Sequence, residues 1–110
     1  MRAILLDELR PDDVAKVTDY LDAQATLSGI EGLYWVDLDD GLLTSLQAEH
    51  KDCQPHRFAI EVGHDFVKLE LFIRSAAGLR CPCAAYASEE QRRFILAMAD
   101  RLIDELSLKT

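Results

Sequence analysis

Two short segments, HKDCQPH (residues 50–56) and CPC (residues 81–83), hold every cysteine of the chain and two of its three histidines. Thiolates and imidazoles are the usual ligands of zinc, and a structural zinc site takes four of them in a tetrahedral arrangement. The spacing therefore permits one site with three cysteines and one histidine. The candidate ligands are Cys53, His56, Cys81 and Cys83, with His50 as the substitute histidine.

Two other interpretations of these residues stay open. The C-x-C spacing is a weaker metal signature than paired C-x₂-C segments, and free cysteine often behaves as a small buried hydrophobe. We favour this packing interpretation, in which small side chains at Cys81 and Cys83 let the C-terminal helix lie close to the sheet. Thiol redox chemistry would instead need an exposed thiolate of low pKa. A sulfur separation within about 4 Å between Cys53 and the other two would favour a metal.

A β-hairpin between the two segments must position them. In RFAIEV and in FVKLELFIR, apolar and polar residues alternate with a period of two, and the GHD between them suits a tight loop. This pattern predicts strands over 57–62 and 66–74. The hairpin begins just after the first segment and ends just before the second, so it could bring them together.

The other elements follow from capping and turn residues. Pro11 suits the first position of a helix, and Ser28-Gly29 would end it. Thr44 with Gln47, and Ser88 with Gln91, are spaced as capping boxes. We expect helices after each box, the first over 45–51, and strands over 33–38 and 81–87, with Pro82 at an edge because it cannot donate to a ladder.

This order of elements predicts an α+β fold in one domain, residues 1–110. We expect a two-layer sandwich, in which an antiparallel sheet of three to five strands carries two main helices on one face. The segment 1–9, which contains AILL, is compatible with either a strand or a helix.

Charge is unevenly distributed along the chain. The formal net charge is −8, and residues 1–55 carry all of it, since the second half holds as many bases as acids. An acidic surface disfavours nucleic acid and anionic lipid, because both bind through a positive field. No apolar run approaches the roughly 20 residues that span a bilayer, and the N-terminus lacks the pattern of a signal peptide. We therefore expect a cytoplasmic protein.

No catalytic motif is visible. The chain lacks a nucleophile elbow and a glycine-rich phosphate loop, and the acidic turn DLDDG does not fit the register of a calcium-binding loop. Phe66 and Phe72 interrupt the polar face of the hairpin, which predicts a surface for a protein partner or a homodimer. Our leading hypothesis is a small acidic, non-catalytic interaction module without a cofactor. The alternative is a zinc-binding or thiol-dependent protein.

Three segments resemble those of small uncharacterised bacterial proteins: SGIEGLYWVDL, HRFAIEVGHDFVKLELFIRS and LRCPCAAYASEEQRRFILAMADRL. Together they make up half of the chain. The resemblance implies a bacterial, cytoplasmic protein, and it assigns no activity to any residue.

Overall fold

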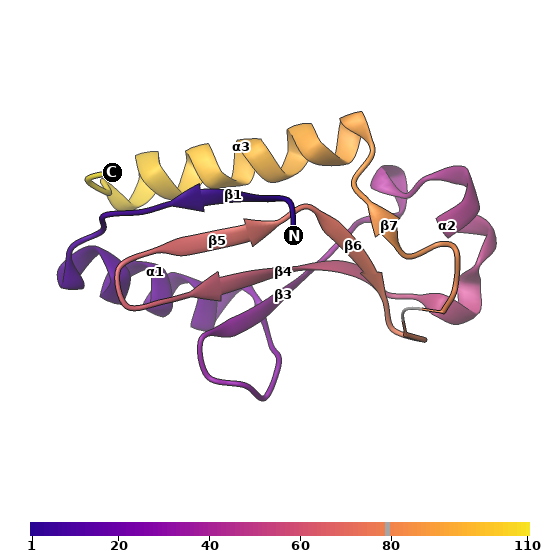
Figure 1. Cartoon of the computed structure of the whole chain (residues 1–110), viewed down its shortest axis with the longest axis horizontal. Coiled ribbons are helices and arrows are strands. Elements are labelled where there is room, and N and C mark those ends of the chain that lie inside the picture. Colours follow the sequence, from indigo (N-terminus) through magenta and orange to yellow (C-terminus); the bar gives the residue numbers. More distant parts are fainter. Residues whose placement is uncertain (79) are drawn as a thin grey trace.

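The computed structural model describes residues 1–78 and 80–110, and it combines one antiparallel sheet with helices at its side and end (Figure 1). Along the chain the elements are β1 (Ala3–Leu6), α1 (Pro11–Gln24), β2 (Thr26–Leu27), β3 (Leu33–Asp37), η1 (Asp40–Leu42), α2 (Ser45–Glu49), η2 (Lys51–Cys53), β4 (His56–Val62), β5 (Val67–Glu70), β6 (Phe72–Ser75), β7 (Ala85–Tyr86) and α3 (Glu89–Leu106). The predicted α+β class is confirmed.

The sheet has more strands than the three to five that we predicted. Its order is β1-β5-β4-β3-β2, and β6 pairs with β4 and β7, so the described residues form seven strands. The segment AILL is a strand, paired with β5 at one edge. The prediction undercounted because the two-residue β2 is too short to show alternation, and because the single strand predicted over 66–74 is split into β5 and β6.

The second strand of the predicted hairpin is broken in two. Ile60 of β4 faces Leu69 of β5, whereas Arg57 of β4 faces Arg74 of β6. The four residues 70–73 therefore lie opposite the two residues 58–59 of β4. Such a mismatch is a β-bulge, and it bends the strand that carries the extra residues. Figure 1 shows β6 leaving the line of β5 toward the end of the molecule that holds α2 and β7.

Both long helices pack on the same core. Val17 and Leu21 of α1 and Ile95 and Leu102 of α3 are buried in one cluster. The strand residues of that cluster are Leu6, Tyr34, Phe58, Ile60, Val67, Leu69 and Ile73. Helix α1 ends before the predicted Ser28-Gly29 because Thr26 and Leu27 pair with β3. Within the described residues, no helix is both long and apolar enough to cross a bilayer.

Candidate metal centre

The first half of the centre is a single 3₁₀ turn. Helix α2 ends at Glu49, and the amide of Cys53 then donates to the carbonyl of His50 at 3.0 Å. Side chains three residues apart eclipse each other in a 3₁₀ turn. The spacing of His50 and Cys53 therefore places both side chains on one side of the same turn.

The second half is a turn as well, which corrects the strand predicted over 81–87. The amide of Ala84 donates to the carbonyl of Cys81 at 3.1 Å, and only Ala85–Tyr86 is extended. Pro82 stands at the second position of this turn, where its fixed φ is favourable and its missing N–H is not needed. The turn folds Cys83 back toward Cys81.

The two turns meet with their ligand atoms together. The Nδ1 or Nε2 of His50 and the sulfurs of Cys53, Cys81 and Cys83 all lie within 4.8 Å of one another. The Cys81 sulfur is central: it lies 2.9 Å from His50 Nδ1, 3.4 Å from the Cys53 sulfur and 2.9 Å from the Cys83 sulfur. A tetrahedral zinc with bonds of about 2.3 Å separates its sulfurs by about 3.8 Å. The cluster is therefore compatible with a metal site after a small outward movement.

His56, the histidine named first from the sequence, lies outside this set of four. It begins β4 and is buried, and its Nε2 is 3.4 Å from the Cys83 sulfur. Its Nδ1 is buried and has no hydrogen-bond partner among the described residues. Burial lowers the pKa of His56, and the neighbouring His50 lowers it further. The ring is therefore neutral near pH 7 and able to face a thiol or a metal.

Backbone hydrogen bonds hold the two cysteine turns in place. The carbonyl of Cys53 accepts from the Ser75 hydroxyl at 3.1 Å and from the Ala76 amide at 3.0 Å, so the end of β6 anchors it. The carbonyl of Cys83 accepts from Gln47 Nε2 at 3.1 Å. Each turn is thus fixed by a segment distant in sequence.

Gln47 belongs to a buried amide pair that joins two helices. Both predicted capping boxes are present, with Gln47 closing one and Gln91 the other. Gln91 Nε2 donates to Gln47 Oε1 at 2.8 Å and to the Leu42 carbonyl at 2.8 Å. The start of α3 therefore positions α2, and α2 in turn positions Cys83.

Cys81 and Cys83 differ in acidity because of burial and of the hydrogen bonds between the crowded thiols. Burial raises the pKa of Cys83 to about 12, and hydrogen bonds with Cys81 and Cys53 add to the rise. Hydrogen bonds from the side chain and the backbone of Cys83 lower the pKa of Cys81. Cys81 thus becomes a thiolate more readily than Cys83. A bound divalent cation would counteract the raised pKa of Cys83, because coordination to the metal displaces the thiol proton.

The two phenylalanines named as an interface are half-buried. Phe72 meets Tyr86 edge to face, with ring centroids 5.2 Å apart, and the Arg74 guanidinium lies 5.7 Å from its centroid. Phe66 lines a shallow hollow beside the exposed Leu5. The interface at these residues stays a prediction.

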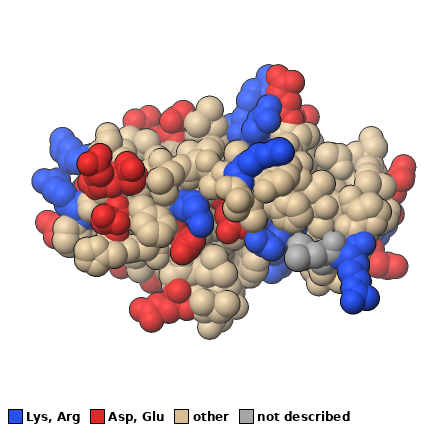
Figure 2. Space-filling model, in the orientation of Figure 1, with Lys and Arg blue, Asp and Glu red and all other residues tan. Residues whose placement is uncertain are grey.

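On the face seen in Figure 2, acidic and basic side chains are interspersed.

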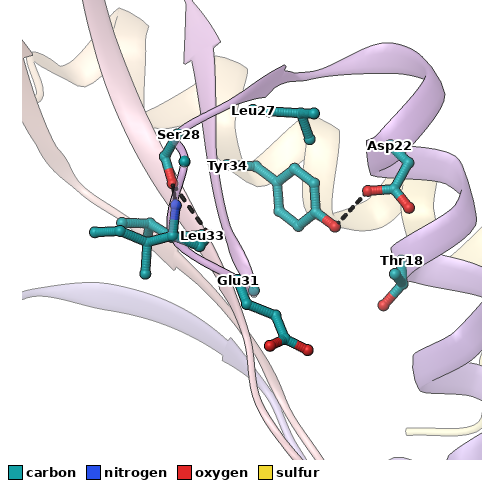
Figure 3. A pocket seen from close by; sticks show the side chains of 10 residues that line it. Thr18, Asp22, Leu27, Ser28, Glu31, Leu33 and Tyr34 are labelled. Carbon is teal, nitrogen blue, oxygen red and sulfur yellow. Dashed lines mark hydrogen bonds between the residues drawn. The ribbon is translucent and has the colours of Figure 1, made fainter.

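A second hollow, of about 370 Å³, lies between α1 and the loop that joins β2 to β3. Figure 3 shows Tyr34 pointing across it, where its hydroxyl donates to Asp22 Oδ1 at 2.7 Å. This hydrogen bond, burial and the charges of nearby carboxylates, Glu31 among them, raise the pKa of Tyr34 to about 12. The hollow was not identified from the sequence, because its residues come from a helix and a loop without a shared motif.

Comparisons with family models, with curated proteins and with solved structures find no match for this chain. The geometry of the described residues therefore carries the functional argument.

Proposed function

We propose that this protein is a zinc-binding domain in which His50, Cys53, Cys81 and Cys83 coordinate one ion. The observation that supports this most is the convergence of four ligand atoms within 4.8 Å from two separate turns. Packing alone gives no reason for a histidine nitrogen and three sulfurs to point at one another. Three thiolates and an imidazole form a soft ligand set, which zinc accepts in tetrahedral geometry.

The role we propose for the ion is structural. Four protein ligands close a tetrahedral site, whereas a catalytic zinc keeps one position for water or substrate. Cys53 and Cys83 are also buried, with exposed fractions of 8% and 1%. Such a site stabilises a fold and does not present the metal to a substrate.

The position of the cluster supports this role. The main hydrophobic core lies between the sheet and helices α1 and α3, and it does not include the three cysteines. The end of the molecule that carries α2, η2 and the turn after β6 consists of short elements (Figure 1). A metal joining the two turns would stabilise this end, since metal-binding free energy becomes folding free energy when no site exists in the unfolded chain.

The deciding experiment measures the metal content of protein purified under reducing conditions. We expect one zinc per chain in the wild type and less than a tenth of that in Cys83→Ser and Cys53→Ser. Replacing the zinc with cobalt should give the strong thiolate-to-cobalt absorption and the visible bands of a tetrahedral site. Freshly reduced wild type that contains no metal and takes up neither ion would refute the proposal.

Three histidine variants identify the fourth ligand. His50→Gln should weaken zinc binding by at least tenfold, whereas His64→Gln, at an exposed position remote from the cluster, should leave it unchanged. His56→Gln should retain one zinc with a modest loss of affinity if the ring contacts only Cys83. Loss of the zinc in His56→Gln but not in His50→Gln would assign the ligand to His56, as we first named it from the sequence.

An interaction module is the second candidate function, and the hollow beside Tyr34 supports it. Leu27 and Ile30 there are 65% and 66% exposed, and Asp22 and Glu31 line the same hollow, which has no basic lining residue. We infer a partner segment that combines apolar and basic residues, because it would complement both features.

Fluorescence titration with a peptide of alternating lysine and leucine tests this second function. A matched peptide with glutamine in place of lysine should bind at least tenfold more weakly. Ile30→Ser should weaken binding of the lysine peptide, and Leu5→Ser, at an apolar position elsewhere that is 53% exposed, should not. Equal binding of the two peptides, or equal effects of the two variants, would refute the assignment.

A further inference from the structure

Cys81 differs from the other two cysteines in both position and exposure. Its sulfur contacts the His50 ring and both other sulfurs. Cys53 and Cys83 are buried. Cys81 is half-buried and stands in a turn at the surface. A small reagent that reaches the cluster from solvent therefore meets Cys81 first.

We propose that Cys81 is an oxidation site for hydroperoxides, and that a disulfide between Cys53 and Cys81 then releases the metal. This inference rests on the proposed zinc site and adds a means of regulating it. It needs an attacking sulfur that solvent can reach and a second sulfur close enough to complete the disulfide. Both are present in the cluster.

Cys53 is the better partner for the disulfide. Its sulfur lies 3.4 Å from that of Cys81, so an approach of about 1.4 Å would reach bonding distance. The Cys83 sulfur is closer, at 2.9 Å, but a bond between residues two apart closes a very small ring with strained geometry. Gln47 also holds the carbonyl of Cys83 in place, which opposes the backbone movement that this ring would require.

The chemistry balances with a hydroperoxide as the only oxidant. The Cys81 thiolate attacks one peroxide oxygen, the O–O bond breaks, and Cys81 becomes a sulfenic acid while the other oxygen leaves as an alkoxide or hydroxide and takes a proton. The Cys53 thiolate then attacks the Cys81 sulfur, the S–S bond forms, and the S–O bond breaks to give water after protonation. Two thiolates lose two electrons in total, and one peroxide gains them.

A disulfide between Cys53 and Cys81 would remove two of the four zinc ligands. Disulfide sulfur is a far poorer zinc ligand than thiolate, so only His50 and Cys83 would remain. Two ligands cannot complete a tetrahedral site, and the ion would leave. The new disulfide would still join the two turns, so the end of the molecule would stay crosslinked, and a dithiol reductant would restore the site.

The test adds hydrogen peroxide stepwise to wild-type protein whose zinc content has been measured first. We expect about one zinc released per peroxide consumed, read with a chromophoric chelator, and a Cys53–Cys81 linked peptide after alkylation and proteolysis. Reduction with a dithiol should restore zinc binding in full. In Cys53→Ser, which should hold little zinc and lacks the sulfur that completes the disulfide, peroxide should instead leave a sulfenic acid at Cys81 that a dimedone probe labels.

The outcomes separate this inference from the zinc proposal. Freshly reduced protein that contains no zinc before any peroxide is added, and takes up neither zinc nor cobalt, would refute both. Protein that holds zinc but keeps it through ten equivalents of peroxide would refute the inference alone. So would zinc release accompanied by a Cys81–Cys83 disulfide, or by sulfinic acid in place of a disulfide.

Discussion

The cysteine–histidine cluster and the hollow beside Tyr34 both gather polar side chains from segments that are distant in sequence, but they differ in how well those groups satisfy one another. In the hollow, a phenol donor meets a carboxylate acceptor at 2.7 Å. In the cluster, the Cys81 sulfur lies 3.4 Å from that of Cys53 and 2.9 Å from that of Cys83, and sulfur is both a weak donor and a weak acceptor. His56 Nδ1 beside them is buried and finds no partner among the described residues.

This difference indicates which of the two regions is better suited to bind an ion. The Tyr34–Asp22 pair is complete by itself, so it stabilises the fold whether or not a partner binds. The thiols gain little from one another, and an ion that accepted their lone pairs would account for their crowding. Polar side chains that converge without forming strong hydrogen bonds to one another, as the thiols do, are therefore the better candidates for binding an ion.

Removing the metal should have the largest effect. We expect a strong chelator to lower the free energy of unfolding by several kcal/mol, since an ion at 1,000 times its Kd contributes about 4 kcal/mol. Hydrogen exchange should rise in α2, η2 and residues 81–84, while amides near Tyr34 keep their protection. Uniform loss of protection across the sheet, or no change at all, would contradict the assignment of the metal to this end of the molecule.

Breaking the amide pair should have an intermediate effect on the cluster. Gln47→Leu leaves the Cys83 carbonyl without its donor, and Gln91 Nε2 keeps only its hydrogen bond to the Leu42 carbonyl, which together costs about 1–3 kcal/mol. It should also weaken zinc binding, because Cys83 loses its anchor. Gln24→Leu, at an exposed position in α1, is the matched control and should change neither quantity. Chemical denaturation and competition with a chelator measure the two effects.

Tyr34→Phe should have the smallest effect and should leave zinc binding unchanged. Losing the hydrogen bond to Asp22 should cost about 0.5–1.5 kcal/mol at pH 7.

The same residue gives a pH dependence. The pKa of Tyr34 is raised to about 12 in the folded protein from an ordinary value of 10.0. The unfolded chain thus loses this proton first, so stability is fully present below pH 10 and falls as the pH rises from 10 to 12. Denaturation across this range should show the fall in wild type, and Tyr34→Phe should lack that part of it. Equal slopes in the two proteins would show that Tyr34 does not contribute.

The elements that local sequence specifies were predicted well. Pro11 begins α1, and both capping boxes close as their spacing indicates. Alternation located β4 and the start of β5, because a period of two reflects one buried face of a strand. The break at Leu71 was missed, since the bulge leaves the apolar pattern nearly intact on both sides of it.

The candidate site was predicted less completely. The three cysteines were named, and the Cys53 sulfur lies 3.4 Å from that of Cys81, within the 4 Å that we set as favouring a metal, and within 4.8 Å of that of Cys83. His56 was preferred to His50 from spacing along the chain, but the 3₁₀ turn puts His50 on the side of Cys53. Such a turn depends on hydrogen bonds that the spacing of two residue types does not reveal.

The sequence by itself determined where the helices begin, where β3 and β4 lie, and which residue types are available to bind a metal. These properties depend on residues within a few positions of one another in the chain, so local propensity and periodicity are enough to predict them. Only the tertiary structure decided that Gln47 meets Gln91, that the bent β6 anchors Cys53, and that the two turns bring their ligand atoms together. These contacts join segments 22 to 44 residues apart, and they depend on sheet register and on a bulge that no local pattern encodes.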